Sequence, residues 1–97
     1  RDFSAVEKKA LSDEEIGDLE DEQKNEQLAI YWCAKEAIFK LTSQYDVDFA
    51  EQIQIDGFRY RNEGELSATF TDKDGYEQEL NLYYFTFDRH VLVCVSA

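Results

Sequence analysis

The chain has 97 residues, of which 43% are hydrophobic and 14% aromatic, and it carries a formal net charge of −12. This length and composition are typical of one small globular domain, so we expect a single domain over residues 1–97. The acidity argues against a nucleic-acid partner, which needs a basic patch, and against an anionic membrane surface. No apolar run reaches the roughly 20 residues of a membrane-spanning helix, and no signal peptide is visible, so the sequence predicts a soluble, cytoplasmic protein.

Capping signals predict short helices in the N-terminal part. Ser4 with Glu7, and Ser12 with Glu15, each match the S-x-x-E capping box, in which both side chains satisfy free backbone amides at the start of a helix. A longer and more strongly apolar helix follows them. The sequence predicts helices over residues 5–11, 13–22 and 25–43.

Beyond this helix, apolar residues recur at every second position, which is typical of strands with one buried face. Turn residues separate these runs, so we expect an antiparallel β-meander with the long helix packed across it, an α+β fold. Residues 80–87 and 91–95 are apolar on both faces, which predicts central strands. The alternating sets are Ile53 and Ile55; Leu66, Ala68 and Phe70; Leu80, Leu82 and Tyr84; and Val91, Val93 and Val95.

The two cysteines, Cys33 and Cys94, lie within apolar segments and do not form a close C-x-x-C pair. A zinc site or a redox motif is therefore not expected. We predict two buried, reduced thiols, as in a cytoplasmic protein.

The long helix carries an unexpected group of charges. Between Leu28 and Leu41 every residue is apolar except Lys35, Glu36 and Lys40. On a helical wheel Glu36 and Lys40 share one face, apart from the predicted core stripe. That stripe consists of Ile30, Ala34, Ala37, Ile38 and Leu41.

Two explanations fit this charged face. Glu36 and Lys40 have the favourable order of a helical ion pair, which stabilises a helix by about 0.2 to 0.5 kcal/mol. Alternatively, Glu36 is a carboxylate at the edge of a cleft that binds a hard cation, with lysines beside it that receive phosphate groups.

The segment "WCAKEAIFK", from Trp32 to Lys40, resembles the W-x-x-K-E-A-x-x-K signature of the 4′-phosphopantetheinyl transferases. These enzymes move phosphopantetheine from coenzyme A onto a serine of a carrier protein. "LSDEE" at 11–15 is similar to the segment that precedes this helix in the family, and "YYFTFDRHVLVCVSA" at 83–97 resembles its closing strands. The resemblance covers essentially the whole chain.

The resemblance implies a role for several residues. Glu36 would be a Mg²⁺ ligand, and Lys40 would contact the phosphates of coenzyme A or assist proton removal from the carrier serine. Lys35 would also face phosphate, and Trp32 would form part of the wall of the site. The implied cofactor is Mg²⁺, the co-substrate is coenzyme A, and the partner is an acyl or peptidyl carrier protein.

The family's other acidic metal ligands lie in a G-x-D-x-E stretch, which this sequence does not contain. Long members of the family have two similar halves with the site between them, and this chain resembles the C-terminal half. We therefore expect the chain to be catalytically incomplete alone and to pair with an N-terminal half or with a second copy. The alternative is a non-catalytic, protein-binding or self-associating α+β domain.

Two further motifs are interpreted as structural. Asp72 to Gly75 resembles a calcium loop only faintly, because the first and twelfth loop positions would be Phe70 and Asn81, which cannot serve; we expect a hairpin turn. His90 has no cluster of metal-binding residues around it in the sequence, and we expect it to begin a strand without a metal or acid–base role.

Overall fold

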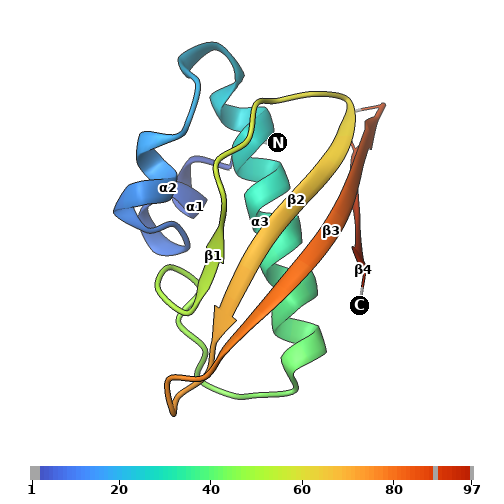
Figure 1. Ribbon diagram of the computed structural model, residues 1–97. Coiled ribbons are helices and arrows are strands. Elements are labelled where there is room, and N and C mark those ends of the chain that lie inside the picture. Colours follow the sequence, from blue (N-terminus) through green and yellow to red (C-terminus); the bar gives the residue numbers. More distant parts are fainter. Residues whose placement is uncertain (1–2, 89, 97) are drawn as a thin grey trace.

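A computed structural model describes residues 3–88 and 90–96 of the chain. Short helices come first, one long helix follows, and four strands complete the described part, as the sequence predicts. The long helix packs on one face of the sheet, so the fold is α+β (Figure 1). The helices are α1 (Ser4–Lys9), α2 (Asp13–Gly17), the 3-10 helix η1 (Asp21–Gln23) and α3 (Lys24–Thr42), and the strands are β1 (Ile53–Ile55), β2 (Glu63–Thr71), β3 (Glu77–Phe87) and β4 (His90–Ser96).

The strands form one antiparallel sheet in the order β1-β2-β3-β4, so each strand pairs with its neighbour in the sequence. Ala68 pairs with Leu80, and Leu82 lies between Leu66 and Val95. Because side chains alternate between the two faces of a strand, this register places the predicted apolar sets on one face. The meander and its alternation are confirmed.

The segment from Asp72 to Gly75 is the turn between β2 and β3. The Asp72 carboxylate accepts the backbone N–H groups of Asp74 at 2.9 Å and Tyr76 at 3.0 Å. Gly75 has φ of 90°, a left-handed conformation that glycine adopts without a steric penalty. The prediction of a hairpin turn is confirmed.

The hydrophobic core lies between α3 and the inner face of the sheet. Tyr31 of α3 contacts the ring of Phe58 at 5.1 Å between centroids, and Phe58 contacts Tyr84 of β3 at 5.9 Å. Leu41, which the helical wheel places on the core stripe, is instead 55% exposed because α3 ends at the next residue and leaves the core there. The fully or almost fully buried apolar residues of α3 are Leu28, Ile30, Tyr31, Ala34 and Ile38.

The short helices differ in part from the prediction. Ser12 and Glu15 form the capping box at α2, but Phe3 is the N-cap of α1, so Ser4 is not in the capping position. α2 ends at Gly17, five residues before the predicted end, which fits the low helix propensity of glycine. None of the helices in residues 3–88 and 90–96 is long and apolar enough to cross a membrane.

The last strand is not central, which corrects the prediction for residues 91–95. β4 pairs with β3 only and lies at the edge of the sheet (Figure 1). Val91, Val93 and Val95 are half-buried, whereas Leu92 and Cys94 are exposed on the other face. Neither cysteine forms a disulfide within the described residues, but Cys94 is exposed and Cys33 is half-buried, so the prediction that both are buried is wrong.

Tyr31 carries a hydroxyl group that has no hydrogen-bond partner within the described residues, although its side chain is fully buried. A buried polar group without a partner loses its hydration and gains nothing in return. Burial, reinforced by the charges of Glu15 and Asp18, also raises the pKa of Tyr31 above its ordinary value.

We therefore expect Tyr31→Phe to raise the free energy of unfolding at neutral pH by about 1 kcal/mol. The wild-type protein should also lose stability above about pH 10, because the unfolded phenol then releases a proton that the folded one retains. Chemical denaturation of both proteins at neutral and alkaline pH tests this. A variant that is less stable than the wild type at neutral pH would contradict this expectation. So would a variant whose free energy of unfolding falls at alkaline pH as much as that of the wild type.

Candidate functional site

Glu36 and Lys40 lie on the second half of α3, away from the core. Glu36 is half-buried and Lys40, about one turn later, is exposed. No ion pair joins Glu36 to Lys40 in the part of the chain that the structure describes. The explanation of the charged face as a helical ion pair therefore finds no support in the geometry, and the Glu36 carboxylate forms no ion pair with any of the described residues.

An aromatic cluster flanks this face. The ring of Trp32 lies 5.6 Å from that of Phe49, and the ring of Phe39 lies 5.3 Å from the same ring. Phe49 belongs to the segment between α3 and β1, so this segment folds back onto the helix beside Glu36. Trp32 thus forms part of an aromatic wall next to Glu36.

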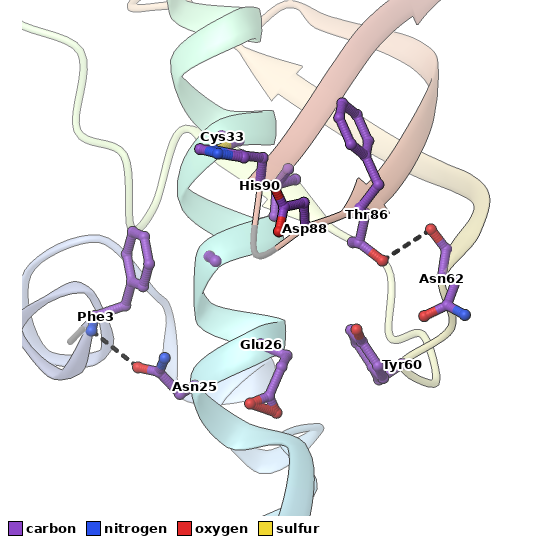
Figure 2. A pocket seen from close by; sticks show the side chains of 12 residues that line it. Phe3, Asn25, Glu26, Cys33, Tyr60, Asn62, Thr86, Asp88 and His90 are labelled. Carbon is purple, nitrogen blue, oxygen red and sulfur yellow. Dashed lines mark hydrogen bonds between the residues drawn. The ribbon is translucent and has the colours of Figure 1, made fainter. Parts of the chain in front are cut away.

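A pocket of about 810 Å³ lies along the first half of α3, between that helix and the turn that joins β3 to β4 (Figure 2). On the helix it is lined by Asn25, Glu26, Ala29 and Cys33. Residues three or four apart are neighbours on a helix surface, so Glu36 follows Cys33 on the same stripe. Glu36 therefore lies about one turn beyond the end of the pocket.

The opposite wall of the pocket comes from β3, β4 and the segment before β2. Thr86 donates a hydrogen bond from its backbone N–H to the carbonyl oxygen of Asn62 at 2.6 Å, and its hydroxyl donates to the same oxygen at 3.0 Å. His90 begins β4, as predicted, and lies beside Asp88 at the rim (Figure 2). The wall therefore combines hydrogen-bonding groups with the apolar side chains of Phe87 and Val91.

A buried amide holds this wall against the helices. The side-chain oxygen of Gln27 accepts the N–H of Glu20 at 2.6 Å, and its nitrogen donates to the carbonyl oxygen of Phe58 at 3.1 Å. The Glu20 carboxylate in turn accepts the N–H of Tyr60, which lines the pocket, at 3.0 Å. The role of Gln27 could not be predicted from the sequence, because a glutamine at the start of a helix gives no signal that it is buried.

Lys35 does not lie on the face that carries Glu36, which corrects the prediction that it faces phosphate. Its side chain is fully buried, and its Nζ donates to the carbonyl oxygens of Ala10 at 2.8 Å and Phe49 at 2.6 Å and to Oε1 of Glu15 at 2.7 Å. An ammonium group has three N–H donors, so none remains for a ligand. Burial lowers the pKa of Lys35, against the opposing effect of its hydrogen bond to Glu15.

Glu15 completes this buried ion pair and joins several segments. Its Oε1 also accepts the backbone N–H of Ser12 at 2.9 Å, and its Oε2 accepts the N–H of Ile55 at 2.9 Å. The Ser12 hydroxyl donates to Gln54 at 2.8 Å. The capping box at α2 therefore also connects β1 and α3, a role that the S-x-x-E pattern alone does not predict.

Glu36 is the residue that the family resemblance implies as a metal ligand. No group of three or more His, Cys, Asp or Glu side chains that could hold a metal ion occurs within residues 3–88 and 90–96. Mg²⁺ usually takes only one or two protein carboxylates and keeps its other positions for water and phosphate oxygens. Glu36 does not line the pocket; as a half-buried carboxylate it would fill one such ligand position, and the remaining ligands would have to come from elsewhere.

Comparison with known proteins identifies the family of the chain. The family model of the 4′-phosphopantetheinyl transferase superfamily matches residues 1–95. Searches of the curated proteins and of the solved structures gave no match. The matched range includes residues 32–40 on α3 and all four strands except the last residue of β4.

Proposed function

Because the chain belongs to the 4′-phosphopantetheinyl transferase superfamily, we propose that it serves the Mg²⁺-dependent transfer of 4′-phosphopantetheine from coenzyme A to a carrier protein. The acceptor in this proposal is a serine of an acyl or peptidyl carrier protein. The single observation that carries the proposal is the placement of Glu36, a half-buried carboxylate that forms no ion pair with the described residues. The use of coenzyme A is consistent with a cytoplasmic protein.

Glu36 and Lys40 have distinct roles in this proposal. Glu36 would hold Mg²⁺, which when bound neutralises charge on the pyrophosphate of coenzyme A. The exposed ammonium of Lys40, about one turn away, would contact phosphate oxygens or help to remove the proton from the serine hydroxyl. Transfer from a pyrophosphate depends mainly on alignment and charge stabilisation, so a carboxylate and a lysine on one rigid helix suit it.

A second polypeptide segment would complete the site. The described residues offer no cluster of three metal-binding side chains, so Glu36 would hold Mg²⁺ only weakly without further ligands. We propose that the remaining ligands come from an N-terminal half of the fold or from a second copy of the chain. Transfer of phosphopantetheine by a monomer of this chain, at the rate of a complete transferase, would refute that part of the proposal.

Calorimetric titration with coenzyme A tests the role of Glu36. We expect binding to require Mg²⁺ in the wild-type protein, and Glu36→Ala to weaken that Mg²⁺-dependent binding by about tenfold or more, since a direct ligand to the ion is lost. Glu14→Ala removes the same charge from an exposed position on α2 and is the matched control. Unchanged Mg²⁺-dependent binding by Glu36→Ala would overturn the assignment.

The second candidate function is that of a non-catalytic interaction domain. It is favoured by the large apolar side chains that β3 and β4 expose on the outer face of the sheet, among them Phe87 and Leu92. Sedimentation and calorimetry together distinguish the two functions. Protein binding or self-association without any Mg²⁺-dependent affinity for coenzyme A would favour the interaction domain.

A further inference from the structure

The segment between α3 and β1 contains a tight turn over residues 48–52. The backbone N–H of Gln52 donates to the carbonyl oxygen of Asp48 at 2.8 Å, and the Asp48 carboxylate accepts the N–H of Ala50 at 2.9 Å. The side chain of Gln52 also donates to the carbonyl oxygen of Thr71, at the end of β2, at 3.1 Å. The turn is therefore held in shape by its own polar groups and attached to the sheet.

Phe49, which lies in this turn, contacts α3 through both its carbonyl group and its ring. The carbonyl oxygen accepts a hydrogen bond from Nζ of Lys35 at 2.6 Å, and the Lys35 side chain is 0% exposed. The ring centroid lies 5.6 Å from that of Trp32 and 5.3 Å from that of Phe39. We refer to these three rings as the aromatic wall. The buried lysine therefore fixes the backbone of the residue whose ring joins the other two.

Glu36 is half-buried and lies beside the aromatic wall. Trp32 precedes it by four residues and Phe39 follows it by three, so both are its neighbours on the surface of α3. On a helical wheel they lie about 40° and 60° from Glu36 on one side, and Cys33, which lines the pocket, lies about 60° away on the other. Bulky rings on one side restrict the rotamers that are open to the carboxylate. The wall therefore favours orientations of the carboxylate on the side of the helix that carries the pocket.

We propose that Lys35 is a positioning residue for Glu36: its hydrogen bond to the Phe49 carbonyl oxygen holds the aromatic wall against α3, and the wall orients the Glu36 carboxylate for a bound cation. This inference rests on the proposed function, in which Glu36 holds Mg²⁺. Lys35 is itself fixed by Oε1 of Glu15 at 2.7 Å and by the carbonyl oxygen of Ala10 at 2.8 Å. The two adjacent charges on α3 thus have different tasks, and Lys35 serves the site without touching a ligand.

The fluorescence of Trp32, the single tryptophan of the chain, tests whether Lys35 holds the wall. Lys35→Met with Glu15→Gln removes the hydrogen-bond donor without leaving a buried carboxylate unpaired. We expect this double variant, while circular dichroism shows it to be folded, to emit at longer wavelength than the wild type and to be quenched more strongly by acrylamide. Leu82→Ala also destabilises the fold, but from the sheet, and should leave both properties unchanged. Equal quenching of the double variant and the wild type would overturn the proposal.

Phe49→Leu and Phe49→Tyr test whether the wall positions Glu36. Both keep the backbone carbonyl group that Lys35 contacts, but only tyrosine keeps the ring. In calorimetric titration with coenzyme A, Phe49→Leu should raise the Mg²⁺ concentration that supports half-maximal binding by about tenfold, as is typical when a group that orients a metal ligand is lost. Phe49→Tyr and Leu82→Ala should leave that concentration nearly unchanged. A merely structural role of the ring would lower stability without altering the Mg²⁺ dependence of the folded protein.

The outcomes separate this inference from the proposed function. If Glu36→Ala weakens Mg²⁺-dependent binding and Phe49→Leu does not, the wall has no positioning role and the proposed function stands. Equal losses in Phe49→Leu and Phe49→Tyr would contradict the inference in the same way, because the ring would then be irrelevant. If the wild-type protein shows no Mg²⁺-dependent binding of coenzyme A, the proposed function fails and the positioning role fails with it.

Discussion

Lys35→Met is expected to lower the free energy of unfolding by about 3–5 kcal/mol, because it leaves the Glu15 carboxylate charged and without its cation inside the protein. The two side chains are 0% and 1% exposed and lie 2.7 Å apart. The substitution also removes the donor to the carbonyl oxygens of Ala10 and Phe49. Denaturant titration followed by the fluorescence of Trp32, which packs on Phe49, measures the loss.

Two comparisons separate this effect from a general sensitivity of α3. Lys40→Met removes the same charge from an exposed position on the same helix and should change stability by no more than about 0.5 kcal/mol. In a double-mutant cycle, Lys35→Met with Glu15→Gln should cost less than the sum of the single substitutions, because the buried charge disappears with its partner. A loss for Lys35→Met as small as that for Lys40→Met would show that the ion pair is not important for stability.

Leu82→Ala is expected to lower the free energy of unfolding by about 2–5 kcal/mol. Leu82 is fully buried on β3, directly between Leu66 of β2 and Val95 of β4. The change removes buried apolar surface and leaves a cavity that the paired strands on both sides cannot easily close. Thermal or chemical unfolding of the purified variant measures the effect.

The adjacent residue is the control for Leu82. Asn81 lies on the same strand but faces outward and is exposed, so Asn81→Ala should change stability by no more than about 0.5 kcal/mol. A similar loss from both substitutions would contradict the register, because a shift by one residue exchanges the inner and outer faces of a strand.

The order of the elements could be predicted from local patterns. The apolar positions of α3 and the alternation in β1 to β4 appear within single segments, so period and turn residues suffice to locate them. The capping box of Ser12 and Glu15 is likewise formed by neighbours in the sequence. The signature around Glu36 indicated the family, which the match over residues 1–95 supports.

The burial of Lys35 and its hydrogen-bond partners could not be predicted from local patterns. Its three acceptors lie 25, 20 and 14 residues away along the chain, and two of them are backbone carbonyl oxygens that no residue type reveals. A lysine within an apolar helix is equally compatible with a ligand site and with a buried ion pair. Only the packing of α1, α2 and the segment after α3 around this side chain decides between them.

The sequence by itself therefore determined the helices, the strands, the meander order and the family, because each depends on contacts or patterns within short stretches. The tertiary structure alone decided that Lys35 is a buried structural cation and that β4 is an edge strand with an exposed apolar face. Both depend on which distant segments lie next to a residue. An apolar strand has the same sequence pattern whether a neighbouring strand, a helix or another protein covers it.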